Sequence, residues 1–324
     1  MEVVQRSLSL LIVALLSGSA VAAVQGQAQG QPTTPQATFR GGVNRVALNV
    51  TVRNRQGKII TGLRATDFEL IDSGTQRKID EFRTETSPVS LGLLVDFSGS
   101  MDVAAKRAAA RENAFHLLSW LESGVDQAGL YVFDKELREV QALSPAPGNI
   151  LAQLDSVRRP FGATSLFDAI AETGRRLRDQ AGLRRAVVAL TDGSDNASRM
   201  TAAEVSTLAS SIDVPVYIVV VVSPFDRERT ATATATDDRL ERVFDGPPAD
   251  LARWTGGEIF AGVTPASSSQ AARQIVTELR QQYLIAFEPD STPGWHPIEV
   301  RVRDKDLVVR TRSGYVTRNQ PSVP

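Results

Sequence analysis

The sequence contains no cysteine, and this absence excludes several kinds of chemistry at once. There can be no disulfide, no thiolate metal site, no cysteine nucleophile and no lipid anchor on a cysteine. Histidine is almost as scarce, because the chain has only His116 and His296, which lie far apart in the sequence. A zinc site built from histidines and a Ser-His-Asp triad are therefore both disfavoured.

The chain also lacks an excess of charge of either sign. It has 36 Lys and Arg residues against 37 Asp and Glu residues, which gives a formal net charge of -1. This balance provides no electrostatic reason to expect nucleic acid or an anionic membrane surface as a partner. The hydrophobic content of 42% and the charged content of 23% are typical of a globular protein, and a length of 324 residues predicts two domains.

The first 43 residues are predicted to lie outside the fold. An apolar run from Leu8 to Leu16 is too short to span a bilayer of about 30 Å, and small residues follow it. We interpret residues 1–22 as an export signal cleaved near Ala22, with a buried N-terminal helix as the alternative. Residues 23–43, rich in Gln, Gly and Pro, are predicted to be a flexible linker. The mature protein is therefore expected to be periplasmic or secreted, with no stable membrane anchor.

Apolar residues alternate with polar ones in two segments, residues 44–86 and 283–318. In the first, for example, Val46, Leu48, Val50 and Val52 alternate with more polar neighbours, which predicts a strand with one buried face. Further strands are expected over residues 67–71, 77–82, 283–287, 298–302 and 307–311. Each segment alone has too few strands for a stable sheet unit, so we predict that the two pair with each other in a small β-sandwich. Residues 319–324 are expected to form a tail.

The segment between them, residues 87–282, has a different pattern. Continuously apolar runs alternate with helical periodicity, which predicts a doubly wound α/β domain with a mostly parallel sheet, inserted into the β-sandwich. The expected strands are residues 91–95, 129–133, 186–190 and 214–222, and the clearest expected helices are residues 103–122, 201–211 and 268–282.

Oxygen-bearing side chains follow two of these buried strands. Asp96, Ser98 and Ser100 come directly after one strand, Asp192 comes directly after another, and Thr164 lies in a loop before a helix. Ligands of open α/β sheets bind beyond the carboxyl ends of the strands, so we expect the five residues to meet there. Carboxylates and hydroxyls without nitrogen or sulfur select a hard cation, Mg²⁺ first and Mn²⁺ or Ca²⁺ as alternatives.

Each of these residues also has an ordinary structural explanation. Ser98 and Ser100 could cap the following helix, and Thr164 and Asp192 could be turn residues. Their joint occurrence in this order favours the metal site. Four further acids could support the site from behind or could belong to solvated loops and helix ends: Asp102, Asp134, Asp168 and Asp195.

The motifs D-x-S-x-S, G-x-T and T-D-G resemble the metal-ion-dependent adhesion site of von Willebrand factor type A domains, over residues 88 to 282. The resemblance implies that Ser98, Ser100 and Thr164 bind the ion directly or nearly so. It implies that Asp96 and Asp192 act directly or through water, and that an Asp or Glu carboxylate of a protein partner completes the coordination. The flanking V-T-V-R-N-R-Q-G and R-T-R-S-G-Y-V resemble an exported bacterial subgroup of acidobacterial type.

The sequence thus predicts an exported, metal-dependent protein-binding module without catalysis. A structural envelope protein with a vestigial metal site is one alternative, and a Mg²⁺-dependent hydrolase or phosphotransferase is another. The enzyme is disfavoured because residues 87–282 contain no G-x-S-x-G, G-x-x-x-x-G-K-[ST] or D-x-D motif and no histidine lies near the proposed site, which leaves Lys106 as a speculative base. The long segment 223–248 is predicted to overhang the metal site and help select the partner, or else to be a solvated insertion.

Overall fold

The computed structural model describes residues 45–84, 86–103, 105–157, 162–178, 184–222 and 242–317. The predicted signal, linker and C-terminal tail, and residues 223–241 of the long insertion, lie outside the described residues. None of the described helices is long and apolar enough to cross a membrane.

A six-stranded sheet forms the centre of the segment predicted to be α/β, and its strand order is β10-β9-β8-β5-β6-β7. All neighbouring strands are parallel except β7, which runs antiparallel to β6 at one edge. This confirms the predicted doubly wound, mostly parallel sheet. Its strands are β5 (Val89–Asp96), β6 (Gln127–Phe133), β7 (Leu137–Ser144), β8 (Arg184–Thr191), β9 (Val216–Val221) and β10 (Ile259–Gly262).

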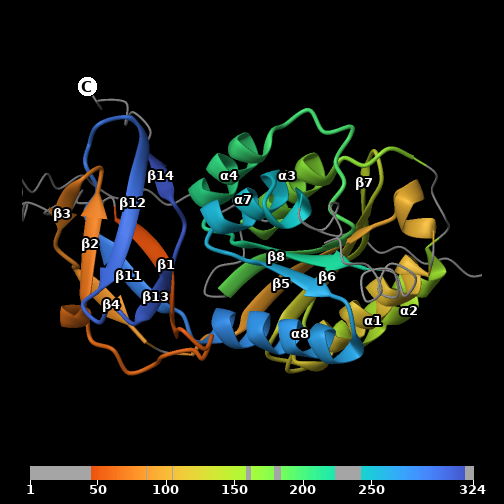
Figure 1. Ribbon diagram of the computed structural model, residues 1–324, viewed down its shortest axis with the longest axis horizontal. Coiled ribbons are helices and arrows are strands. Elements are labelled where there is room, and N and C mark those ends of the chain that lie inside the picture. The colour runs from red at the N-terminus through yellow and green to blue at the C-terminus, as the bar shows by residue number, and fades with distance from the viewer. Residues whose placement is uncertain are drawn as a thin grey trace, which may run out of the picture. The chain divides into compact units, whose positions relative to one another are not determined.

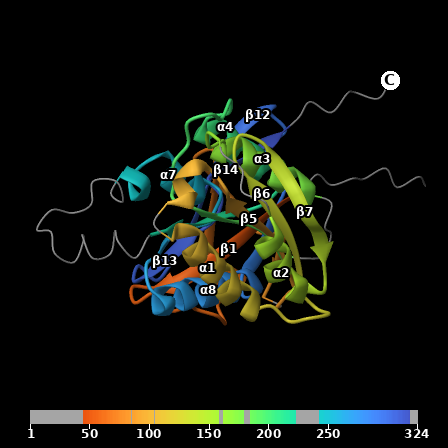
Figure 2. The ribbon, with the colours of Figure 1, turned by 90° about the vertical axis from the view of Figure 1, so that its right-hand side faces the viewer.

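Helices cover both faces of this sheet (Figure 1). One face packs against α1 (Lys106–Ser119), α2 (Ile150–Ser156) and α8 (Pro265–Arg280), and Figure 2 shows the same three helices together in the turned view. The other face packs against α3 (Leu166–Leu177), α4 (Ala202–Ser211) and α7 (Pro247–Trp254). Burial on both sides explains why β5 and β9 are buried along their whole length.

The first of these helices begins later than its periodicity predicts. We expected a helix over residues 103–122, but α1 starts at Lys106 and ends at Ser119. A single 3-10 turn, η2 (Gly99–Asp102), comes before it, and Ala105 has a left-handed backbone with φ of 61°. The chain therefore turns between the end of β5 and α1, and Lys106 becomes the first residue of the helix.

Two antiparallel sheets, β13-β1-β11-β4 and β14-β12-β2-β3, face each other across a shared apolar core. Both sheets combine strands from before and after the α/β segment, since β1 pairs with β11 and β2 pairs with β12. The predicted insertion into a small β-sandwich is confirmed. The strands are β1 (Val46–Asn54), β2 (Phe68–Asp72), β3 (Thr75–Arg77), β4 (Glu81–Arg83), β11 (Tyr283–Phe287), β12 (Gly294–Val302), β13 (Leu307–Arg310) and β14 (Gly314–Thr317), with the 3-10 turn η1 (Ala65–Asp67) before β2.

One predicted strand of the sandwich was wrong. The pattern of residues 77–82 indicated a single strand, but β3 ends at Arg77 and β4 begins at Glu81. The two short strands belong to different sheets, because the chain crosses from one sheet of the sandwich to the other between them. A strand-like residue pattern can thus continue across a point where the chain leaves one sheet and joins the other.

Charged side chains join the sandwich to the α/β segment. Glu278 of α8 is fully buried and pairs with Arg53 of β1 and Arg310 of β13. Glu258, just before β10, lies 2.8 Å from Arg53 and 2.6 Å from Arg310. Two guanidinium groups from the sandwich thus share two carboxylates from the inserted segment.

Candidate metal centre

The candidate site lies where the strand order of the central sheet reverses. β5 is the first strand of the sheet in sequence, and it lies between β6 and β8. It ends at Asp96, and its neighbour β8 ends at Thr191, directly before Asp192. The two strands are parallel, with Val95 opposite Leu190, so their carboxyl ends are adjacent. A crevice at such a reversal is where open α/β sheets bind ligands.

The carboxylate of Asp96 is held by the residues on either side of this crevice. One oxygen, Oδ1, accepts a hydrogen bond from the backbone N–H of Ser98 at 2.8 Å. The other, Oδ2, accepts a hydrogen bond from the hydroxyl of Thr191 at 2.6 Å. The Oγ atoms of Ser98 and Ser100 lie 3.1 Å apart. Asp96 and Ser98 are each only 1% exposed, so their oxygens face into the protein.

The loop that carries Thr164 is fixed between two others. On one side, Gly99 donates its N–H to the carbonyl of Gly162 at 3.3 Å. On the other side, the N–H of Thr164 donates to Oδ1 of Asn196 at 2.8 Å, and the Thr164 carbonyl accepts from the N–H of Asn196 at 3.0 Å. The structure therefore brings together the three loops from which the five predicted ligands come.

Asp192 has a partner that the sequence patterns did not indicate. Its Oδ2 accepts a hydrogen bond from Nζ of Lys106 at 2.8 Å, and its Oδ1 accepts one from the N–H of Ser194 at 3.2 Å. The side chains of Lys106 and Asp192 are 6% and 2% exposed, so this is a buried ion pair. The sequence analysis considered Lys106 only as a base for an enzyme, and the pair depends on contacts between residues distant in the chain.

The electrostatics of the site favour a cation beside Asp96. The pKa of Asp96 is raised from its ordinary value of 3.8 to about 6. Burial is the main cause, and the nearby charge of Asp192 adds to it, although hydrogen bonds from Thr191 and Ser98 lower the pKa. The hydrogen bonds thus compensate the buried charge only in part, and a positive ion would stabilise it further.

The residues present fit a hard divalent cation. Two carboxylates and three hydroxyls, with no sulfur or nitrogen donor among them, suit Mg²⁺, Mn²⁺ or Ca²⁺. Among the described residues, no group of three or more His, Cys, Asp and Glu side chains could hold a metal ion. A metal centre at this position would therefore depend on the hydroxyls of Ser98, Ser100 and Thr164 as well as on the two aspartates.

The other acids near the site hold loops in place. Asp168 accepts hydrogen bonds from the N–H groups of Arg199 and Met200, both at 3.0 Å. Asp195 accepts a hydrogen bond from the hydroxyl of Ser198 at 2.6 Å, and it accepts another from a backbone N–H at the start of α3. These contacts tie the loop after β8 to α3, which also fixes the position of Thr164.

Asp134 and Asp102 have similar local roles. Asp134 accepts a hydrogen bond from the N–H of Glu136 at 3.0 Å, and its carbonyl accepts one from the N–H of Ser165 at 2.9 Å. Asp102 lies 3.5 Å from the guanidinium group of Arg107.

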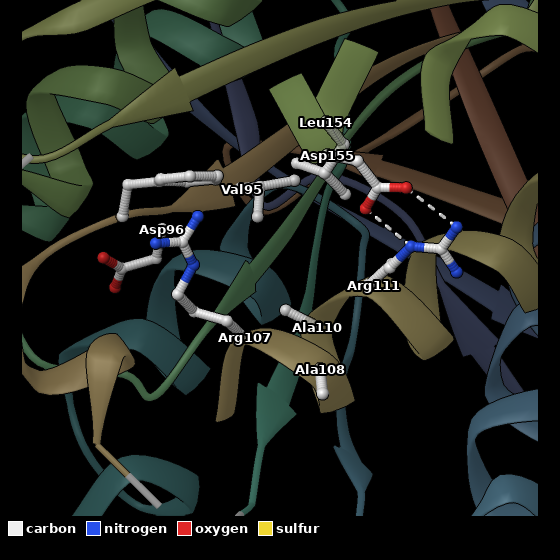
Figure 3. A pocket seen from close by; sticks show the side chains of 9 residues that line it. Val95, Asp96, Arg107, Ala108, Ala110, Arg111, Leu154 and Asp155 are labelled. Atoms are coloured by element: carbon white, nitrogen blue, oxygen red, sulfur yellow. Dashed lines mark hydrogen bonds and ion pairs between the residues drawn. The ribbon is translucent and has the colours of Figure 1, made fainter. Parts of the chain in front are cut away.

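A pocket of about 200 Å³ opens beside the end of β5, between α1 and α2 (Figure 3). The guanidinium group of Arg107 lies 4.6 Å from the ring centre of Phe97, on the side of the pocket where Asp96 lies. The opposite wall carries Arg111, which makes two hydrogen bonds with Asp155 at 2.7 and 2.9 Å. The pocket therefore places one cationic group, the guanidinium of Arg107, next to the candidate site.

Comparisons with known proteins give only weak similarities. No protein-family model matches the chain, and no curated protein matches it. The chain is similar to the solved structure of an aerotolerance-related membrane protein from Bacteroides fragilis, with 20% identity over 59% of this chain and 98% of that chain and a TM-score of 0.46. It is similar to BatB from Bacteroides thetaiotaomicron, with 17% identity, the same coverage and a TM-score of 0.46. A von Willebrand factor type A structure from Catenulispora acidiphila is 13% identical over 84% of this chain and 75% of that chain, with a TM-score of 0.44.

Proposed function

We propose that this protein is an exported module that binds a protein partner through a divalent cation. One observation supports the proposal: three hydrogen-bonded loops that carry oxygen-bearing side chains adjoin at the reversal point of a doubly wound sheet, and the buried carboxylate of Asp96 there has a raised pKa. A bound cation would compensate the buried negative charge of this carboxylate. The proposed ligands are Asp96, Ser98, Ser100, Thr164 and Asp192.

The role of each ligand follows the resemblance to von Willebrand factor type A domains. Ser98, Ser100 and Thr164 bind the ion with their hydroxyls, and Asp96 and Asp192 bind it directly or through water. An Asp or Glu carboxylate of the partner completes the coordination. Mg²⁺ is the proposed ion, with Mn²⁺ or Ca²⁺ as alternatives, and the resemblance to the exported acidobacterial-type subgroup supports a periplasmic or secreted location.

Catalysis is not part of this proposal. A hydrolase would need a base near the ion, and Lys106 is instead paired with Asp192 at 2.8 Å in a buried position. The same ion pair favours a second candidate function, a structural envelope protein whose metal site is vestigial, because an internal ammonium group already partners one of the proposed ligands. The two functions differ in whether the protein binds a divalent cation.

Ion binding by the purified protein tests the proposal directly. Titration calorimetry with Mg²⁺ and Mn²⁺ should detect one site, and the ions should raise the melting temperature. Asp96→Ala should abolish both responses and leave the protein folded. Asp306→Ala is the matched control, since Asp306 is 75% exposed in a turn of the sandwich. This variant should bind the ions as the parent does. Equal binding by Asp96→Ala and the parent would contradict the assignment.

Partner binding is the second part of the test. Immobilised protein should retain a protein from envelope extracts in Mg²⁺, and a chelator should release it. The Asp96→Ala variant should retain none of it. Retention that is the same for parent and variant, and insensitive to the chelator, would rule out a metal-bridged contact.

A further inference from the structure

Lys106 is unusual because its ammonium group is buried at a proposed metal site. It is the first residue of α1, its side chain is 6% exposed, and its Nζ lies 2.8 Å from Oδ2 of Asp192. Lysine is almost never buried in this way unless it is paired. The pair therefore places a fixed positive charge in contact with a carboxylate that the proposed function assigns to the ion.

The neighbouring cation is engaged differently. Arg107, the next residue of α1, lies over the ring of Phe97 and 3.5 Å from Asp102. The carboxylate of Asp96 accepts hydrogen bonds from the Ser98 N–H and the Thr191 hydroxyl, and it is repelled by the negative charge of Asp192. Lys106 is thus a cation that directly contacts one of the two carboxylates, while the other carries hydrogen bonds from neutral groups.

We infer that Lys106 opposes the divalent cation and makes its binding depend on an anionic group from the partner. This inference rests on the proposed function. The charges of Asp96, Asp192 and Lys106 add up to one net negative charge, and a divalent cation would turn the net charge of the site positive. The net positive charge of the ion-loaded site attracts an anionic ligand. Without Lys106, the two carboxylates would neutralise the ion, and the attraction for a partner carboxylate would fall.

The size of this effect is within reach of measurement. Two unit charges a few ångströms apart repel each other even in water and more strongly near a protein surface, and the ion carries two charges. Removing the ammonium group should therefore strengthen ion binding on the order of tenfold or more. Lys106 would then act as a determinant of specificity, because it weakens ion binding by the protein alone and leaves the bound ion attractive to an anionic partner.

Calorimetry on the full chain with two variants at this position tests the inference. Lys106→Met removes the charge and the hydrogen bond, and Lys106→Gln removes the charge but keeps a donor for Asp192. Lys58→Met is the control for the loss of one positive charge, since Lys58 is exposed in a turn of the sandwich. Each protein is titrated with Mg²⁺ in sodium acetate, as the carboxylate probe, and in sodium chloride of equal ionic strength.

Both Lys106 variants should bind Mg²⁺ about tenfold or more tightly than the parent. Acetate should tighten Mg²⁺ binding by the parent and by Lys58→Met, but not by the Lys106 variants. If the parent binds no Mg²⁺ even in acetate and a Lys106 variant does, Lys106 blocks the ion outright, and both the proposed function and the inference are overturned. If the parent binds Mg²⁺ and both variants bind it equally or more weakly, the inference is overturned and the proposed function remains. If none of the proteins binds Mg²⁺, both are overturned.

Discussion

Replacing Asp96 by Asn should stabilise the ion-free protein at alkaline pH. The carboxylate of Asp96 is 1% exposed, and its pKa is raised to about 6 from an ordinary value of 3.8. Folding at high pH therefore has to bury a charge that the unfolded chain leaves in water. Asparagine is nearly the same size and carries no charge, so the variant avoids this cost.

The magnitude follows from the pKa shift. One pKa unit corresponds to about 1.4 kcal/mol, so the charge of Asp96 destabilises the ion-free fold by about 3 kcal/mol above pH 6. The variant also weakens the hydrogen bond that Asp96 accepts from the Thr191 hydroxyl at 2.6 Å, at a cost of about 1 kcal/mol. The free energy of unfolding should therefore rise by about 2 kcal/mol at pH 8.

The effect should depend on pH in a defined direction. Because the folded-state pKa of Asp96 is the higher one, the folded protein binds the proton more tightly than the unfolded chain. The stability from protonation is fully present below pH 3.8 and is lost as the pH rises through about 6. The advantage of Asp96→Asn should therefore be largest at pH 8 and disappear near pH 4.

Urea unfolding with a chelator present, at several pH values from 8 to 4, measures this difference. Asp306→Asn is the control, because Asp306 is exposed, and its difference from the parent should stay near zero. With Mg²⁺ added, the ranking should reverse at pH 8, since only the parent gains stability from the ion. A difference between Asp96→Asn and the parent that is the same at pH 8 and pH 4 would refute the reasoning.

Two further predictions concern the packing that supports the site. Glu278→Gln should lower the free energy of unfolding by about 2–3 kcal/mol, because it removes one of the two carboxylates that the partly buried guanidinium groups of Arg53 and Arg310 share, whereas Glu299→Gln on the exposed face of β12 should change little. Urea unfolding that ranks the two variants equally would contradict this. Gly92→Ala should cost about 1–3 kcal/mol, because a Cβ there would lie 2.7 Å from a methyl group of α3, while Gly148→Ala meets nothing within 4 Å. Equal melting temperatures for the two alanine variants would show that α3 moves away freely.

The sequence determined the fold class because the buried faces of strands and helices require apolar residues at regular intervals. Strands β5 and β9 are buried on both faces and are continuously apolar, whereas β12 alternates between buried and exposed residues. The edge strand β7 escaped detection, since its half-exposed, partly charged residues show neither pattern and its place depends on pairing with β6. Similarly, periodicity alone could not show that α1 starts only at Lys106, after a turn.

The meeting of the loops that carry the five candidate ligands was also predictable, because each candidate follows a strand or precedes a helix in a short motif, and parallel strands bring their carboxyl ends to one edge. Only the tertiary structure decided what else is in the site. Lys106 and Asp192 are 86 residues apart, and they meet because β5 and β8 are neighbours and a turn after β5 directs the start of α1 toward the end of β8. Local patterns record which face of an element is buried. They do not record which charge lies opposite, since that depends on strand order and on where a helix begins.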